Sequence, residues 1–205
     1  MSATSRAIAA AYDARAEEYT AIAGELAQMD PRDIATIRGW RDDTAGALLD
    51  AGCGPGHWTA FLAEGGREAR GVDLSAEFVA VARTRHPGIR FEVGSFRALP
   101  AEDASLAGIL AWYSLIHTPP EEAPLALAEF ARVLRPAGTL LLGFFDGEPG
   151  EPFAHAVTAA YFWSAEALGE MLADTGFEVE WSEIRDRIPG EISRRPHGAL
   201  LARRV

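Results

Sequence analysis

The 205-residue sequence predicts an α/β fold in which helices cover both faces of a mostly parallel sheet. Two observations lead to this prediction. Short apolar runs of strand length alternate with helical segments from residue 47 onward. A glycine-rich turn separates the first apolar run from the helix after it, as in a strand–turn–helix–strand unit. Ligand sites in such folds lie at the carboxyl ends of the strands, so the loops there are the segments of interest.

Two helices are expected before the sheet. Apolar side chains recur at helical spacing over residues 5–27, and Asp30-Pro31 is typical of the start of a second helix, which reaches Trp40. The sheet and its helices follow in a regular order. We expect strands at 48–49, 71–73, 89–93, 106–113, 139–145, 177–184 and 199–202, and helices at 57–65, from 75, at 121–134 and at 164–175. The sequence shows no internal repeat and no long linker, so it predicts a single structural domain.

Composition narrows the function classes. The chain is 48% apolar and 24% charged, as expected of a soluble globular protein. Its net charge of −11 argues against nucleic acid or an anionic membrane as the main partner. All 19 basic side chains are arginine, which excludes lysine Schiff-base chemistry and a phosphate-binding lysine. The single cysteine, Cys53, excludes an intrachain disulfide. We expect a cytoplasmic protein with no leader, no membrane span and no metal site.

The turn after the first strand predicts a cofactor site. Glycines at 52, 54 and 56 let backbone N–H groups approach a ligand closely, because no side chain obstructs them. Asp73 follows Gly56 by 17 residues and ends the next strand, where a carboxylate can accept hydrogen bonds from a ribose diol. Together these features indicate a cofactor that contains adenosine.

Three residues argue against a dinucleotide cofactor. The dinucleotide pattern requires glycine at position 57, where this chain has His57, followed by the bulky Trp58. Asp50 is expected at the rim of the turn. Its carboxylate there disfavours a pyrophosphate and suits a ligand that carries an ammonium and a sulfonium group.

Five segments, in order, resemble the motifs of class I S-adenosylmethionine-dependent methyltransferases, with small bacterial members the most similar. They are LLDAGCGPGHWTAFLAEGG with GVDLS, FEVGSFRALP, AGILAWYSLIH, residues 127–136 with AGTLLLGFF, and SAEALGEMLADTGFEVE. YDARAEEY is similar to the family's N-terminal tyrosine motif. The resemblance implies a three-layer Rossmann-like fold with a mostly parallel seven-stranded sheet. It also implies that residues 1–45 cover the cofactor site, that 46–205 form the methyltransferase domain, and that 146–163 cover the substrate.

The resemblance implies S-adenosylmethionine as the cofactor and a role for each matching residue. The glycines would line its methionine part and Asp50 would orient its amino group, while Asp73 would bind the ribose and Leu74 would pack on the adenine. At the third motif, Ser95-Phe96 replaces the usual acid, so Ser95 would accept the adenine amino bond and Phe96 would pack on the ring. Tyr12 and Tyr19 would close over the methionyl chain, or serve only in helix packing. The full cofactor set is Tyr12, Tyr19, Asp50, Gly52, Gly54, Gly56, Trp58, Asp73, Leu74, Ser95, Phe96, Ala111 and Trp112.

Methyl transfer is an in-line displacement, so the protein must align the acceptor and supply a base only where a proton is tightly held. His117 follows a strand and is the first candidate for a base, with packing or capping as its alternative role. His155 and Tyr113 are further catalytic candidates. His86 and His197 are expected at the surface or at strand edges. Four arginines near the C-terminus could bind a substrate acid or form a solvated face: Arg185, Arg187, Arg194 and Arg195.

The leading interpretation is therefore methyl transfer to an oxygen or nitrogen of a small-molecule acceptor. Aromatic side chains in 146–163 suit a pocket for such a molecule, although they could equally pack a helix on the sheet. A nicotinamide-dependent oxidoreductase and a non-catalytic cofactor-binding fold are the alternatives. The protein is expected to be a monomer or a homodimer.

Overall fold

The computed structural model describes residues 2–155, 157–186 and 195–205. Among these residues, seven strands form the main sheet, in the order β3-β2-β1-β4-β5-β9-β8. Their bounds are β1 Leu48–Ala51, β2 Ala69–Asp73, β3 Arg90–Val93, β4 Leu106–Trp112, β5 Leu134–Phe145, β8 Phe177–Arg185 and β9 His197–Arg204. The pairs from β3 to β5 are parallel, and β9 runs antiparallel to both of its neighbours. The predicted mostly parallel seven-stranded sheet is confirmed.

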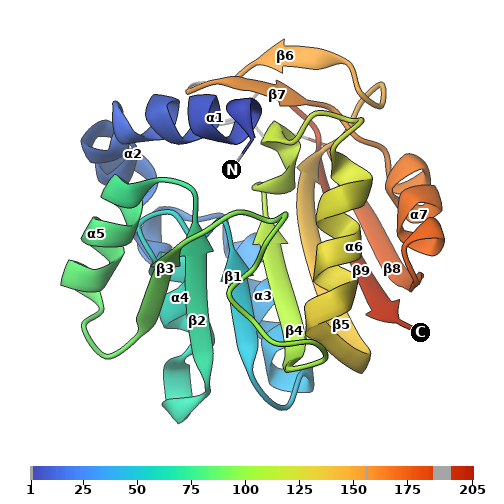
Figure 1. Cartoon of the computed structure of the whole chain (residues 1–205), viewed down its shortest axis with the longest axis horizontal. Coiled ribbons are helices and arrows are strands. Elements are labelled where there is room, and N and C mark those ends of the chain that lie inside the picture. The colour runs from blue at the N-terminus through green and yellow to red at the C-terminus, as the bar shows by residue number, and fades with distance from the viewer. Residues whose placement is uncertain (1, 156, 187–194) are drawn as a thin grey trace.

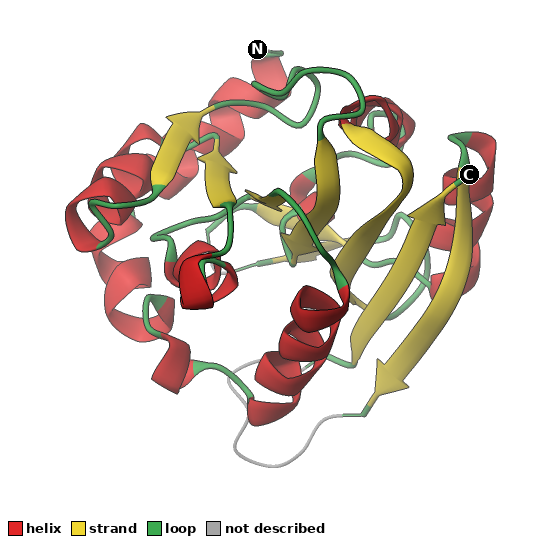
Figure 2. Cartoon of the chain, turned by 90° about the horizontal axis from the view of Figure 1, so that it is seen from below, coloured by secondary structure: helices red, strands yellow, loops and turns green. Residues whose placement is uncertain are grey.

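Helices cover both faces of this sheet and make three layers (Figures 1 and 2). In Figure 1, α3 (Pro31–Asp43) and α4 (His57–Leu62) lie behind the sheet, whereas α6 (Ala123–Val133) and α7 (Ala165–Asp174) lie in front. Helix α5 (Ala76–Arg85) packs beside β2 and β3. Short 3-10 turns, η2 (Glu64–Gly66) and η3 (Leu115–His117), follow α4 and β4.

The alternation of side chains along the central strands builds two cores, one on each face. Leu48 and Leu110 pack with the apolar side chains of α3 and α4. Leu49 and Ile109, their neighbours in sequence, face the opposite way and pack with α6 and α7. All four are at most 1% exposed, so both faces are sealed and the strand ends are held rigidly.

The first helical segment differs from the prediction. Residues 5–27 do not form one helix but three pieces, α1 (Ala3–Asp13), α2 (Ala16–Ala23) and η1 (Leu26–Gln28). Asp13 explains the break. Its carboxylate accepts hydrogen bonds from Ser75 Oγ (2.6 Å) and from the backbone N–H of Glu77 (3.2 Å), at the start of α5. This contact ends α1 over the sheet and turns the chain into α2 (Figure 1).

The segment after β5 forms a small hairpin outside the main sheet. Its antiparallel strands are β6 (Pro152–Ala154) and β7 (Ala159–Tyr161), and it lies at the same end of the molecule as α1 (Figure 1). Strand β5 itself begins earlier than predicted. It starts at Leu134 and not at residue 139, and Pro136 and Gly138 lie in an irregularity inside it, where its pairing with β4 shifts register.

Candidate functional site

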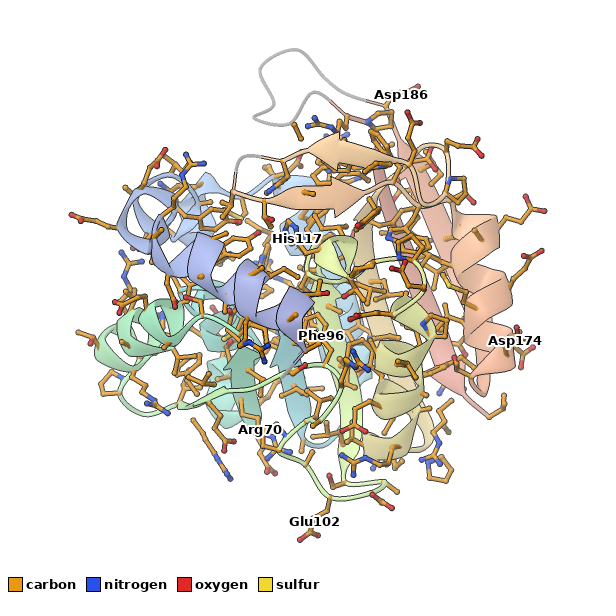
Figure 3. The ribbon with its side chains drawn as sticks, turned by 45° about the horizontal axis from the view of Figure 1, so that its top comes forward. Arg70, Phe96, Glu102, His117, Asp174 and Asp186 are labelled. Atoms are coloured by element: carbon orange, nitrogen blue, oxygen red, sulfur yellow. The ribbon has the colours of Figure 1, made fainter. Side chains whose placement is uncertain are left out.

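A cavity of about 240 Å³ opens where the parallel strands end, beneath α1 and α2. The loops after β1, β2, β3 and β4 form its floor, and residues of α1, α2 and α3 form its roof. The side chains of His117 and Phe96 lie at this end of the molecule, whereas Glu102 lies at the opposite end (Figure 3). Most residues predicted for the cofactor line the cavity: Tyr12, Tyr19, Gly52, Gly54, Trp58, Asp73, Leu74, Ser95, Phe96 and Trp112.

The glycine turn combines left-handed backbone with close packing. Gly52, Gly54 and Gly56 have φ angles of +84°, +51° and +91°. A Cβ at Gly52 would lie 2.3 Å from the Ser114 Cβ, and a Cβ at Gly56 would lie 2.9 Å from the Ala82 Cβ. These two glycines therefore let the turn pack closely against its neighbours. Gly54 differs, because a Cβ there would meet nothing within 4 Å. Gly54 therefore leaves open space for a ligand beside its backbone, although its N–H donates to Asp73. Gly56 does not line the cavity and serves packing.

Asp73 holds the turn and presents its carboxylate to the cavity. Its Oδ2 accepts the Gly54 N–H and its Oδ1 accepts the Ser75 N–H, both at 2.8 Å. Burial raises the pKa of Asp73 to about 6, although these backbone hydrogen bonds act in the opposite direction. Each oxygen keeps a further lone pair for a hydroxyl donor. This geometry fits the two hydroxyls of a ribose.

The position expected for Asp50 is wrong. The side chain is 1% exposed, does not line the cavity, and accepts a hydrogen bond from Thr59 Oγ1 at 2.7 Å. Burial raises its pKa to about 7. Asp50 is part of the fully buried strand β1, so its carboxylate ties that strand to α4 beneath the turn. Ala111 is likewise a core residue of β4, fully buried and outside the cavity lining.

Tyr12 and His117 form a hydrogen-bonded pair on the cavity wall. Tyr12 Oη lies 2.6 Å from His117 Nε2, and His117 Nδ1 lies 3.0 Å from the Ala159 carbonyl oxygen. Because a carbonyl only accepts, Nδ1 carries the proton, and burial lowers the pKa of His117 so that the ring is neutral. Nε2 is then an acceptor and Tyr12 donates to it. Burial also raises the pKa of Tyr12, which keeps the phenol protonated.

Aromatic rings enclose Tyr12. Its ring packs edge-on against Tyr19, at a centroid distance of 6.0 Å, and against His117 at 5.3 Å. Phe78 of α5 contacts both tyrosines. The two tyrosines thus pack on the core and line the cavity at the same time, so the two roles considered for them are compatible.

The residues after β3 also lie at the cavity. Phe96 packs on Phe130 at 5.6 Å with its ring on the cavity wall. The Ser95 hydroxyl accepts the Arg97 N–H at 3.2 Å and remains half-buried beside the cavity. His57, predicted beside the turn, lines the cavity with both ring nitrogens buried and without hydrogen-bond partners.

His155 packs against His117 outside the cavity lining. It does not line the cavity, but its ring lies 5.0 Å from that of His117, and burial lowers its pKa to about 4. None of the described residues of 146–163 lines the cavity. The hairpin instead contacts η3 and holds His117 through the Ala159 carbonyl (Figure 3).

A second tyrosine–histidine pair was not predicted. Tyr113 lines the cavity, and its hydroxyl is hydrogen-bonded to Nδ1 of His197. His197 is thus half-buried against the site, in a strand that is not at the edge of the sheet. Arg185 is buried and paired with Asp33 of α3, so it is not part of a solvated face. Arg195 lies over the Phe153 ring at 4.1 Å, whereas Arg187 and Arg194 fall outside the described residues.

Within residues 2–155, 157–186 and 195–205, no group of three or more His, Cys, Asp or Glu side chains is arranged to hold a metal ion. In the same ranges, no helix combines the length and apolar character needed to cross a bilayer.

Known proteins similar to this chain agree with the geometry. Residues 48–138 match the family model described as a methyltransferase domain. A malonyl-[acyl-carrier protein] O-methyltransferase of Erwinia billingiae is 31% identical over 156 residues, which are 76% of this chain and 59% of that protein. A demethylmenaquinone methyltransferase of Renibacterium salmoninarum is 27% identical over 87% of this chain and 90% of its own length. The chain thus covers less than two thirds of the Erwinia relative.

Solved structures share the fold across nearly the whole chain. The [4+2]-cyclase SpnF superposes with a TM-score of 0.81 at 21% identity, covering 98% of this chain and 96% of the other. A Burkholderia thailandensis 1,6-didemethyltoxoflavin-N1-methyltransferase, solved with S-adenosylhomocysteine bound, has a TM-score of 0.74 at 24% identity. The match covers 96% of this chain and 88% of the other. Identities this low show the fold alone. The domain match, the named relatives and the shared fold together support the class I S-adenosylmethionine-dependent methyltransferase family, which the sequence motifs resemble.

Proposed function

We propose that this chain transfers a methyl group from S-adenosylmethionine to an oxygen or nitrogen atom of a small-molecule acceptor. One observation carries the proposal: a single cavity is lined by the glycine turn, by Asp73 and by the Tyr12–His117 pair. The first two features suit the cofactor. The third supplies a proton acceptor in the same space.

The residues present fit the cofactor. Gly54 leaves open space above its backbone, and the Asp73 carboxylate has two free lone pairs for the ribose hydroxyls. Leu74 and Phe96 would enclose the adenine, and the Ser95 hydroxyl would accept its amino group. When bound, S-adenosylmethionine supplies a methyl group on a sulfonium, a leaving group that needs no further activation. The protein's own task is to align the acceptor and exclude water.

The Tyr12–His117 pair would take the acceptor's proton. An acceptor O–H or N–H gives its proton to Tyr12 Oη while the phenol proton passes to His117 Nε2. The Ala159 carbonyl keeps the His117 ring in the tautomer that this transfer requires. His155, against the outer face of His117, positions that ring, and Tyr113 contacts the acceptor from the opposite wall.

The surrounding segments would select the acceptor. The helices before the sheet would cover the cofactor, since residues of α1 and α2 line the cavity, and 146–163 would cover the acceptor from the hairpin side through the contact with His117. The net charge of −11 supports a metabolite over nucleic acid. The related proteins are named for a malonyl carrier, demethylmenaquinone and 1,6-didemethyltoxoflavin, which also supports a small organic acceptor. We further propose a cytoplasmic monomer or homodimer.

The test is turnover of a metabolite library with S-adenosylmethionine, read as release of S-adenosylhomocysteine. We expect at least one acceptor to be methylated, and the variant His117→Ala to lower its kcat roughly 10²- to 10⁴-fold. The affinity for S-adenosylhomocysteine should stay within about threefold, or about 0.7 kcal/mol, since His117 is assigned to the acceptor and not to the cofactor. Cofactor binding without turnover of any acceptor would contradict the proposal and favour a non-catalytic fold.

A further inference from the structure

The cavity lining contains a residue in a strained backbone conformation. Tyr113 follows β4 directly and has a φ angle of +52°, a backbone conformation that residues with side chains rarely adopt. Its ring packs on Phe145 at 5.0 Å and on Trp112 at 5.4 Å, and its hydroxyl is bonded to His197. Strain of this kind persists where surrounding contacts hold a side chain in one direction, and it is concentrated at binding sites. Here it holds the phenol on the cavity wall.

A buried guanidinium stands behind this wall. Arg185, the last residue of β8, is 9% exposed, and its Nη2 donates to Asp33 Oδ1. The other carboxylate oxygen, Asp33 Oδ2, accepts Trp112 Nε1 at 3.3 Å. Arg185 also lies close enough to the Tyr113 phenol for its charge to act on the pKa of that group. Arg185 itself does not line the cavity, but Asp33 and Tyr113 beside it do, and so does Trp112, which is bonded to Asp33.

One donor of this guanidinium is left unpaired. Arg185 Nη1 is buried and has no hydrogen-bond partner. Buried donors are nearly always paired, and leaving one unpaired on a charged group is costly. If the Arg185–Asp33 ion pair served only to join β8 to α3, that role would explain the bond between the two side chains. It would explain neither the unpaired Nη1 nor the strained backbone of Tyr113.

We propose that Arg185 Nη1, with the Tyr113 phenol beside it, binds a carboxylate group of the acceptor. The inference rests on the proposed function, because it places the acceptor in this cavity. Nη1 carries two open N–H groups, which call for acceptor oxygens, and a carboxylate makes the stronger, charge-assisted bond. The neighbouring Asp33 already offsets the charge of Arg185, so a singly charged carboxylate costs less to accommodate there than a phosphate dianion.

The experiment uses matched fragment pairs as probes. Benzoate and benzamide, hexanoate and hexanamide, and phenylacetate and phenylacetamide are titrated into the full chain saturated with S-adenosylhomocysteine. Binding is followed by ligand-observed NMR. We expect the carboxylate of at least one pair to bind at least about tenfold more tightly than its amide, as one charge-assisted bond predicts. Equal binding within every pair, or no binding of any carboxylate, would overturn the proposal.

Variants then assign the preference to Arg185. Arg185→Gln should abolish the preference for carboxylate and leave the affinity for S-adenosylhomocysteine unchanged. Tyr113→Phe keeps the Arg185–Asp33 pair and should reduce the preference for carboxylate over amide. It therefore provides the test if Arg185→Gln lowers the stability of the protein. Arg203→Gln on β9 is the matched control, because the ion pair of Arg203 with Glu180 lies away from this cavity. This variant should keep the preference for carboxylate.

The two proposals fail in distinguishable ways. If the preference survives in both Arg185→Gln and Tyr113→Phe, the carboxylate subsite is refuted while the methyltransferase assignment stands. If the wild-type chain does not bind S-adenosylhomocysteine at all, the proposed function itself is contradicted.

Discussion

Replacing Asp73 by asparagine tests the cofactor site at its most specific contact. Both carboxylate oxygens already accept a backbone N–H, at 2.8 Å each, and each has one lone pair left for a ribose hydroxyl. In the variant only one oxygen remains, and the amide NH₂ must face a backbone N–H that it cannot accept. The charge-assisted bond lost to the cofactor contributes about 1.5–3 kcal/mol. The Kd for S-adenosylhomocysteine should therefore rise roughly 10- to 150-fold.

Cofactor binding should also depend on pH through Asp73. The pKa of Asp73 is raised to about 6, and its ionised form is the better acceptor for hydroxyl donors, so affinity should be full above pH 7 and fall as pH drops through 6. One unit below that pKa, the loss should be roughly tenfold. Calorimetric titrations between pH 5 and 8 measure it, with the exposed Asp43→Asn variant as control. An Asp73→Asn variant within about twofold of wild type, with an unchanged pH profile, would refute the reasoning.

Three further predictions concern the residues around this contact. NMR of the histidine ring nitrogens should show His117 neutral at pH 7 with the proton on Nδ1; an Nε2–H tautomer would contradict the pairing with Tyr12. Asp50 has a pKa of about 7 when folded, above its ordinary 3.8, so it favours the folded state at low pH and loses that contribution as pH rises towards 7. Asp50→Asn should flatten the stability profile between pH 4 and 7 by up to about 4 kcal/mol in urea unfolding, and an unchanged profile would be evidence against the buried position. Gly56→Ala should cost about 1–3 kcal/mol, because its φ is +91° and a Cβ would meet Ala82 at 2.9 Å, whereas Gly88→Ala, open and at ordinary φ, should change stability by no more than about 0.5 kcal/mol. Equal effects of the two glycine variants would refute the steric account.

The fold, and the clustering at one cavity of most residues expected to bind the cofactor, were predictable because their signals are local. Strand-length apolar runs alternate with helical segments along the chain, and each unit needs only its neighbours to be recognised. The glycine turn and Asp73 lie in one such unit, and the structure brings them within hydrogen-bond distance of each other. Asp50 was misplaced because the chain pattern does not say which way a side chain at the end of a buried strand points.

The acceptor half of the site depends on contacts between distant residues. Tyr12 meets His117 across 105 positions, Tyr113 meets His197 across 84, and Arg185 meets Asp33 across 152. No local pattern marks such pairs. Asp33 looks like an ordinary acid in the first turn of a helix, where it would favour the helix dipole. The break after α1 was missed for the same reason, since Asp13 ends the helix through a contact with a distant helix.

The central claim is that this cavity binds S-adenosylmethionine and presents it to the Tyr12–His117 pair. Calorimetry of the wild-type chain with S-adenosylhomocysteine, with NAD as the competing ligand, tests it most directly. The account predicts one site per chain for S-adenosylhomocysteine, weakened in Asp73→Asn, and no saturable binding of NAD. Saturation by NAD, or no binding of S-adenosylhomocysteine, would contradict it.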